Sequence, residues 1–333
     1  MAVNCLVMGR YTLLIVILVF FYALAVILWQ VLDEVFYLYN FGIIGTFIGL
    51  GVGLWPVLPA KRRYLARLIS QFLVGGYLFF GLGCGLIYLL FGYIMPENMQ
   101  LEGFWFWLFS GTFMAGVIHY AVAKVFGPLI FNRAWCGWAC WTAAILDVLP
   151  WKYNWQKRSG RFRGLRYVHF ALSLALVSVL FFVFDYSIAD TVVKLDVGSN
   201  PSFSGIVSAL VHIPEIWWFL GGNVLYYLVA IALAVLLRDN RAFCKYVCPV
   251  PVFMKATSGY ALLKVDKADK SCIDCKVCEK NCPMEVNITD YINSGKRVSS
   301  TECILCQTCI NTCPKDVLKL SFGLSGKSAR RNK

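Results

Sequence analysis

The sequence Cys272-Ile-Asp-Cys275-Lys-Val-Cys278-Glu-Lys-Asn-Cys282-Pro283 decides the fold of the C-terminal part of the chain. Its pattern, C-x2-C-x2-C-x3-C-P, recurs from Cys303 to Pro314. In this pattern three closely spaced cysteines bind the corners of one cubane iron–sulfur cluster, and the fourth reaches across to a second cluster. We therefore predict two [4Fe–4S] clusters. The expected ligands are Cys272, Cys275, Cys278 and Cys313 for one cluster, and Cys303, Cys306, Cys309 and Cys282 for the other.

Structural zinc and disulfide bonds are the alternatives for so many cysteines. A zinc site uses one set of four ligands, usually without a run of three cysteines before Cys-Pro. The spacing therefore favours iron–sulfur clusters over both alternatives. Residues 270–321 resemble bacterial two-cluster ferredoxins. This resemblance implies a small domain of two similar halves that transfers one electron at a time.

The rest of the chain has the composition of a membrane protein. Hydrophobic residues make up 59% of the chain and charged residues 15%, whereas soluble proteins contain about 25% charged residues. Six apolar stretches are long enough to cross a lipid bilayer, which is the first expected partner. They are residues 12–32, 41–58, 68–94, 104–123, 167–184 and 216–237. We predict an α-helical polytopic membrane protein with six transmembrane helices and a C-terminal α+β ferredoxin domain.

The loop charges predict how the chain is oriented. Basic residues concentrate in residues 61–67, 152–166 and 238–245, whereas the opposite loops carry mainly acidic ones. The positive-inside rule then places both termini and the ferredoxin domain in the cytoplasm, with the spans in the inner membrane. It also accounts for the net charge of +13 without a nucleic-acid partner. The first apolar run is too long for a cleavable signal peptide.

A nine-residue block occurs twice, each time after an apolar stretch. Asn132-Arg133-Ala-Trp-Cys136-Gly-Trp-Ala-Cys140 matches Asn240-Arg241-Ala-Phe-Cys244-Lys-Tyr-Val-Cys248. Residues i and i+4 share a helix face, so each block is expected to present two thiolates together. Two parallel repeats, related by a pseudo-twofold axis along the membrane normal, would bring the four thiolates to one place.

Cys136, Cys140, Cys244 and Cys248 thus predict a third redox centre. An iron–sulfur centre fits four thiolates better than a single metal ion does. Redox-active dithiols and simple buried packing are the alternatives. Cys5 and Cys84 lie outside every motif, and we interpret both as unliganded.

With both motifs in place, the chain resembles the NapH, NosR and CcoG group of polytopic membrane ferredoxins over about residues 62–321. The resemblance implies electron transfer between the quinone pool and a partner protein. The chain departs from it in two ways: the first block ends Cys140-Trp141 rather than Cys-Pro, and residues 1–60 form an extra two-helix hairpin. We expect a four-helix membrane core over residues 61–254, the ferredoxin domain over 255–322 and a basic tail over 323–333.

Four further residues are candidates for cofactor binding. His119 and His169 lie inside predicted spans, where an ionisable side chain is a functional candidate. A structural hydrogen bond is favoured for them over a quinone contact, and a quinone contact over a b haem. Arg133 and Arg241 are equivalent in the two blocks and either offset the negative charge of a cluster or mark the membrane edge.

Three functions follow from these features. The favoured one is relay of single electrons between quinone, or a membrane redox partner, and a cytoplasmic or membrane-bound partner. The alternatives are an accessory metal reductase for cofactor assembly, as the resemblance to CcoG suggests, and an anchoring subunit for peripheral redox proteins. No substrate pocket is evident in the sequence, so we expect a subunit of a membrane complex rather than a self-sufficient enzyme.

Overall fold

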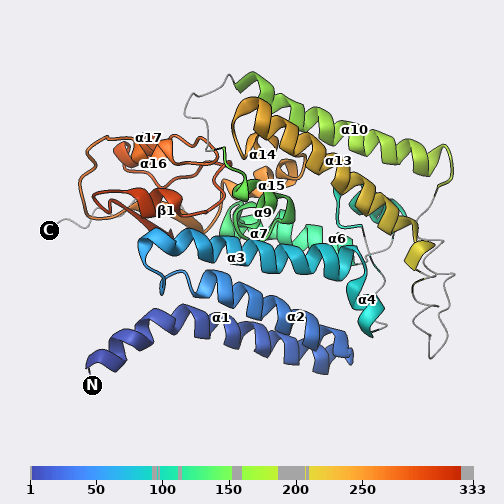
Figure 1. Cartoon of the computed structure of the whole chain (residues 1–333), viewed down its shortest axis with the longest axis horizontal. Helices are drawn as coiled ribbons and strands as arrows, with labels where there is room; N and C mark the ends of the chain where they lie inside the picture. The colour runs from blue at the N-terminus through green and yellow to red at the C-terminus, as the bar shows by residue number, and fades with distance from the viewer. Residues whose placement is uncertain are drawn as a thin grey trace.

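The computed structural model describes residues 2–91, 96, 98–111, 115–151, 160–186, 207 and 210–323. The basic tail from residue 324 onward, most of the loop before residue 214 and the side chain of Cys5 lie outside the described residues. A helical bundle occupies one part of the molecule, and the ferredoxin domain covers one end of it (Figure 1).

Among the described residues, five helices are long and apolar enough to cross a membrane, which indicates a membrane protein. They are built on α1 (Ala2–Leu32), α2 (Val35–Ile48), α3 (Arg63–Gly76), α10 (Leu165–Phe182) and α13 (Pro214–Leu237). Large apolar side chains on their outer faces are exposed, such as Val19, Leu172 and Leu228. A water-soluble protein seldom exposes so much apolar surface, whereas lipid accepts it.

π-helical turns extend two of these helices and form part of a shorter one. They are η1 (Gly49–Gly53) after α2, η3 (Tyr77–Gly83) after α3, and η4 (Ala121–Phe126) between α6 (Ala115–Tyr120) and α7 (Gly127–Phe131). A 3₁₀ turn, η2 (Ala60–Arg62), precedes α3, and α4 (Leu86–Phe91) follows η3. Single π turns inside helices are rare and occur often at functional sites.

The prediction of one transmembrane helix over residues 104–123 is wrong. Helix α5 (Leu101–Phe109) ends in a turn at Gly111, whose φ of 70° suits glycine. The chain then returns through α6, which packs against α5, and the rings of Phe104 and Tyr120 stack with centroids 4.7 Å apart. Phe109 contacts Phe182 at the end of α10, so the turn lies at the end of the bundle away from the ferredoxin domain.

Six spans are therefore not confirmed. The part of the chain that the structure describes has five long apolar helices and one shorter apolar helix over residues 116–131. The segment before α5 is buried at Asn98 and Gln100, and a Cβ atom at Gly222 would collide with the Gln100 side chain. The chain thus enters the bundle at Gln100, leaves along α5 and re-enters along α6. Non-helical backbone at membrane depth is tolerated where protein buries it.

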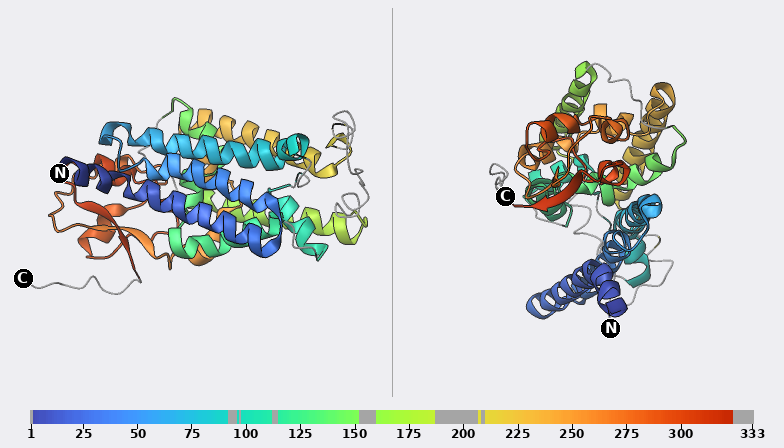
Figure 2. Two further views of the ribbon diagram at one scale, coloured as in Figure 1. Left: turned by 90° about the horizontal axis from the view of Figure 1, so that it is seen from below. Right: turned by 90° about the vertical axis from the view of Figure 1, so that its left-hand side faces the viewer.

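The N-terminal hairpin packs closely on itself. Helices α1 and α2 lie side by side on one flank of the bundle, next to α3 (Figure 2). A Cβ atom at Gly45 would collide with Phe21, and one at Gly53 would lie 2.7 Å from the Cα atom of Leu14. These glycines therefore serve close packing inside the bundle, which is what small residues spaced four apart do in membranes.

Short helices connect the bundle to the ferredoxin domain. They are α8 (Ala134–Trp138), α9 (Trp141–Val148), η5 (Gly160–Gly164), α14 (Ala242–Tyr246) and α15 (Pro251–Ser258). The contacts of α9 in the first half of the bundle have counterparts among those of α15 in the second half. Helix α9 contacts α3 and α13, and α15 contacts α10 and α7. A pseudo-twofold axis between two parallel repeats requires such counterparts, and the axis itself stays a prediction.

The ferredoxin domain pairs its first and last segments. Strand β1 (Leu263–Lys267) runs antiparallel to β2 (Leu318–Phe322), with Leu263 opposite Phe322 and Lys267 opposite Leu318. Helices α16 (Val277–Lys280), α17 (Ile288–Asn293) and α18 (Thr308–Thr312) complete it. Its core contains Val265, Met284, Ile292, Val298 and Leu318.

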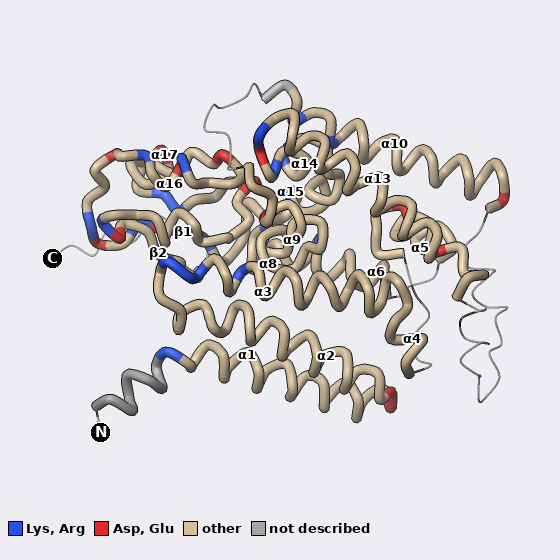
Figure 3. Tube along the Cα trace, in the orientation of Figure 1, with Lys and Arg blue, Asp and Glu red and all other residues tan. Residues whose placement is uncertain are grey.

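Charge is distributed unevenly along the molecule. Lysine and arginine gather at the end of the bundle that carries the ferredoxin domain, where acidic residues also occur, whereas acidic residues mark the opposite ends of α1 and α10 (Figure 3). The described start of α1 also lies at the ferredoxin end (Figures 1 and 2). This asymmetry is the one that the positive-inside rule uses.

Candidate iron–sulfur sites

The two cysteine runs adopt the same backbone conformation. Asp274 and Lys276 have φ values of 50° and 56°, and the equivalent Leu305 and Gln307 have 48° and 58°. These left-handed residues turn the chain tightly around each cysteine run, and Lys276 and Gln307 are the N-cap residues that directly precede α16 and α18. The backbone amides of Val286 and Val317 donate to the sulfur atoms of Cys282 and Cys313, four residues earlier, at 3.4 and 3.3 Å.

Each half of the ferredoxin domain encloses a small cavity of about 20 Å³. The lining of the first, called the distal cavity, includes Cys272, Cys275, Cys278 and Cys313. The lining of the second, called the proximal cavity, includes Cys282, Cys303, Cys306 and Cys309. Each cavity thus gathers three cysteines from one run and the fourth from the other. These are the two sets expected from the spacing, and ligation itself stays a prediction.

Burial raises the pKa of several cysteines in these cavities. The pKa of Cys278 rises to about 11, and those of Cys282 and Cys303 rise to about 12. A thiol with so high a pKa is a poor nucleophile. Iron binds thiolates and displaces these protons, so metal binding rather than thiol chemistry suits these cavities.

The two cavities differ in exposure. At the distal cavity Cys275 is exposed and Ile273 is 56% exposed. At the proximal cavity the equivalent Cys306 and Ile304 are 8% and 2% exposed. The difference arises because the loop from Cys303 to Cys306 docks on the membrane domain.

The first nine-residue block holds this loop. Trp138 donates its indole N–H to the Leu305 carbonyl at 2.9 Å, and the Arg133 amide approaches the Cys303 carbonyl at 3.4 Å. A Cβ atom at Gly137 would collide with the Ile304 carbonyl oxygen. The absence of a side chain at Gly137 therefore allows the block and the proximal cavity to lie in direct contact.

Ion pairs clamp the same junction. Glu302 accepts from Arg133 at 2.6 Å, from Arg166 at 3.0 Å and from Lys255 at 2.6 Å. Burial alone would raise the pKa of Glu302, but these three cations outweigh it and hold the pKa at about 2. In the second block Lys245, the equivalent of Gly137, pairs with Asp239 at 2.6 Å and Glu285 at 2.8 Å.

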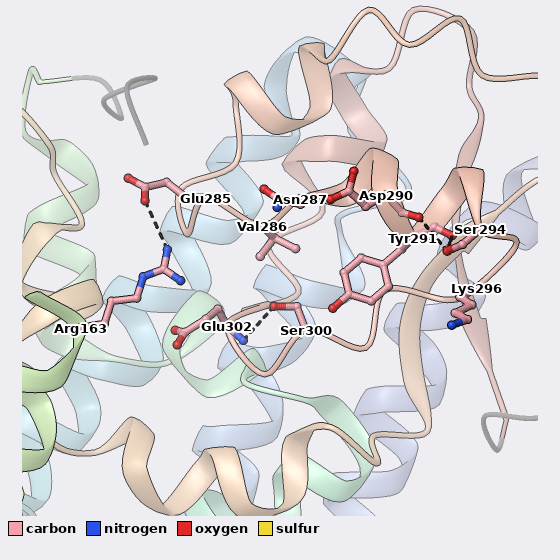
Figure 4. Close-up of a pocket in the computed structure, with 10 residues that line it drawn as sticks. All are labelled: Arg163, Glu285, Val286, Asn287, Asp290, Tyr291, Ser294, Lys296, Ser300 and Glu302. Carbon is pink, nitrogen blue, oxygen red and sulfur yellow. Dashed lines mark hydrogen bonds and ion pairs between the residues drawn. The ribbon is translucent and has the colours of Figure 1, made fainter. Parts of the chain in front are cut away.

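A polar cavity of about 540 Å³ opens beside this junction (Figure 4). Glu285 and Glu302 stand in its wall, and Arg163 reaches Glu285 across one side at 3.4 Å. The carboxylates of Glu285 and Glu302 are thus engaged by protein cations. The cavity marks the seam between η5 and the ferredoxin domain.

The two nine-residue blocks meet at a third cavity of about 60 Å³, called the C-x3-C cavity. All four cysteines of the blocks line it: Cys136, Cys140, Cys244 and Cys248. The expectation that each pair shares one helix is wrong, because α8 ends at Trp138 and α14 at Tyr246. Cys140 and Cys248 follow in the next turns, and both still reach the cavity.

Burial also affects thiols of the C-x3-C cavity. Burial raises the pKa of Cys244 to about 11 and that of Cys248 well above its usual range. A redox-active dithiol needs a thiolate at neutral pH, so this environment disfavours that alternative. In the part of the chain that the structure describes, no three His, Cys, Asp or Glu side chains could hold a metal ion. The cysteines surround cavities instead, which fits ligands that each bind a different iron.

The predicted arginines both line the C-x3-C cavity and are fully buried. Arg241 donates to both carboxylate oxygens of Asp147 at 2.7 and 2.6 Å, to the Cys136 carbonyl at 3.0 Å, and approaches the Cys244 sulfur at 3.8 Å. Asp147 also pairs with Arg67. The two arginines therefore lie at the sulfur cavity and not merely at a membrane edge.

The predicted histidines stand behind the cavity lining rather than in it. His169 engages the Val247 carbonyl at 3.0 Å and the Tyr226 hydroxyl at 3.4 Å, which fits the structural role. The His119 ring lies 4.7 Å from that of Trp135, and its Nε2 has no hydrogen-bond partner among the described residues. The quinone and haem interpretations stay untested. Cys84 packs against the cluster that contains Met99 and Phe219, and it is not part of the lining of the three cysteine cavities.

Sequence reasoning missed Lys124. This residue is 3% exposed, lines the C-x3-C cavity, and places its Nζ 3.3 Å from the centre of the Trp135 ring. A lysine inside the apolar stretch 116–131 was the available signal. It went unused because the predicted fourth span ended at Ala123.

Comparison with known proteins now adds two family matches. A family model described as "4Fe-4S dicluster domain" matches residues 271–318. Another, described as "4Fe-4S binding domain", matches residues 105–161 and 222–264, and each stretch contains one C-x3-C block. The chain thus carries 4Fe–4S ferredoxin-type domains, and together with the apolar helices they define an iron–sulfur protein of the membrane type.

Three curated relatives resemble parts of the chain. The uncharacterized protein MJ0749 of Methanocaldococcus jannaschii is 32% identical over 22% of this chain and 30% of its own length. MJ0750, uncharacterized and from the same organism, is 26% identical over 50% and 64%. "Putative electron transport protein YccM" of Escherichia coli is 25% identical over 51% and 47%.

The chain therefore spans between 30% and 64% of the length of these relatives. No solved structure matches the chain. The matches support iron–sulfur electron transfer in a membrane protein, whereas the narrower resemblance to NapH, NosR and CcoG is not confirmed.

Proposed function

We propose that the protein relays single electrons through three iron–sulfur centres, in the order C-x3-C cavity, proximal cavity, distal cavity. The observation that carries this proposal is that Cys136, Cys140, Cys244 and Cys248 line one cavity beside the proximal one. The residue next to Cys136, Gly137, touches the Ile304 backbone between two proximal cysteines. Bound clusters would accept and donate one electron each.

The polypeptide fixes the distance between the sites, shields cysteines from water and places charged side chains beside them. Trp138 and Glu302 fix the proximal loop on the first block, so the two sites keep a constant separation. Cys306 and Cys309 of the proximal cavity are buried, while Cys275 leaves the distal cavity open to solvent. Electrons would thus exchange with a soluble or peripheral partner at the distal end. The chain would work as the membrane-bound electron-transfer subunit of a larger redox complex.

At the membrane end we propose quinone or a membrane redox protein as the other partner. The C-x3-C cavity lies where apolar spans α3, α10 and α13 converge through α9, α15 and α14, so a lipid-soluble carrier can approach it. The name of YccM, a relative over half of the chain, also speaks of electron transport. The basic ends of the spans support placing the ferredoxin domain in the cytoplasm, beneath the inner membrane.

Iron content tests the third centre. Anaerobically purified protein should contain about twelve irons per chain, four per cubane, and a variant with Cys136, Cys140, Cys244 and Cys248 replaced by serine about eight. Cys84→Ser is the matched control and should keep all of them. An equal count of about eight in wild type and variant would contradict the third centre. Quinol oxidation with and without added copper would then separate electron relay from the metal-reductase alternative.

A further inference from the structure

Lys124 occupies a position that the four cysteines alone do not explain. It lies in the π-helical segment η4, at membrane depth, and is 3% exposed. Its ammonium group faces the C-x3-C cavity and sits over the ring of Trp135, the residue before Cys136. A buried amino group therefore stands next to the predicted ligands.

Lys124 differs from Arg133 and Arg241, the two arginines that also line the C-x3-C cavity. Arg133 is paired with Glu302, and Arg241 is paired with Asp147. Among the described residues Lys124 forms no ion pair with a carboxylate. A buried ammonium without a counter-ion is costly, and the face of one indole offsets only part of that cost. An anion inside the cavity would supply the missing charge.

A second buried group also points to an occupant. Gln100, from the segment that enters the bundle before α5, is 5% exposed and lines the same cavity. Its amide nitrogen has no hydrogen-bond partner among the described residues. Buried donors are nearly always paired, so an unpaired donor at a cavity wall indicates an acceptor within the cavity. The sulfur atoms of a cluster are acceptors that carry negative charge.

We propose that Lys124 is the counter-charge of the third iron–sulfur centre and sets its reduction potential. This inference rests on the proposed function. A cubane with four thiolates is anionic, and each electron that it accepts makes it more so. A fixed ammonium group in a water-poor site therefore stabilises the reduced state more than the oxidised one. Lys124 would raise the potential of this centre and leave the two ferredoxin clusters unchanged.

The test compares three variants by EPR-monitored redox titration. Lys124→Met removes the charge and keeps the length of the side chain, Lys124→Arg keeps the charge, and Lys61→Met removes an exposed lysine as control. We expect Lys124→Met to shift the reduction equilibrium of the third signal at least tenfold toward the oxidised state, about 59 mV for one electron. Lys124→Arg should restore most of the shift, and Lys61→Met should cause none.

The outcomes separate this inference from the proposed function. A wild-type protein with iron for only two clusters would remove the third centre and the proposed relay with it. A third signal whose potential is the same in Lys124→Met would overturn the role of Lys124 alone. Loss of the third signal in Lys124→Met but not in Lys124→Arg would support the counter-charge through cluster assembly. Loss in both variants would show a need for the shape of lysine and contradict the proposal.

Discussion

Glu302 gathers three cations at the junction between the membrane domain and the ferredoxin domain. Three cations from three segments converge on it: Arg133 from the first block, Arg166 from α10 and Lys255 from α15. Their combined charge keeps this buried carboxylate ionised at every pH above about 2. Glu302, which directly precedes Cys303, thus joins three segments of the membrane domain to the proximal loop.

Glu302→Gln should loosen this attachment. Removing one partner of a buried ion pair costs about 3–5 kcal/mol, because the cations stay buried without compensation. We expect a lower thermal unfolding midpoint in detergent and faster proteolysis near residue 260. Asp316→Asn is the control, since its pair with Lys270 is exposed and worth about 0–1 kcal/mol. Equal stability of the two variants would refute the clamp.

Gly137→Ala should separate the two adjacent cavities. The added Cβ atom meets the Ile304 carbonyl, so the proximal loop must move away from the first block. Magnetic coupling between the third and proximal clusters should weaken, as measured by the broadening of their EPR signals. Gly76→Ala is the matched control because no atom lies within 4 Å of its Cβ position. Coupling that survives Gly137→Ala unchanged would mean that the contact does not set the distance.

At the scale of elements, the parts that depend on covalent spacing were predictable. The distance between cysteines along the chain dictates which of them can surround one cluster, so the distal and proximal sets emerged from the sequence. The re-entrant pair of helices α5 and α6 could not be predicted from the sequence. Hydropathy reports only that residues are apolar, and both arms of a hairpin are as apolar as one straight helix. The turn at Gly111 left a weak signal, since isolated glycines also occur inside membrane helices.

Lys124 is a second feature that hydropathy alone did not reveal. A lysine at the end of an apolar stretch reads as the membrane boundary, whereas the structure carries the helix on to Phe131 and buries the ammonium. Pairing of the two blocks at one cavity was expected from their repetition. The contact between that cavity and the proximal loop was not expected, because it depends on the packing of segments more than a hundred residues apart.

The hairpin can be checked by labelling. A cysteine introduced at Ser110, in a background without Cys5 and Cys84, should react with a membrane-impermeant maleimide from the side opposite the ferredoxin domain. The turn lies level with Phe182 at that end of α10. A cysteine at Val177, which is fully buried, is the control and should not react. An unreactive residue 110 would favour one straight helix, in which it would lie within the lipid core.

At the scale of the whole molecule, the three cavities differ in their exposure to solvent. The distal cavity is open at Ile273 and Cys275, the proximal one is closed against the bundle, and the C-x3-C cavity lies between the repeats. We expect an iron chelator to remove about four irons per chain quickly and the rest slowly. The fast phase should match the EPR signal that Cys275→Ser removes. A single rate for all iron would contradict this gradient.

Two similar halves meet two similar blocks, so the domain has two conceivable orientations on the membrane part. Turning it by half a revolution would bring the distal loop to the first block. The residue before Cys272 is Ser271, however, where the residue before Cys303 is Glu302. In the reversed orientation Arg133, Arg166 and Lys255 would face a hydroxyl and stay unneutralised. The difference between one serine and one glutamate therefore favours the orientation in which the proximal half lies against the helical bundle and the distal half points away from it.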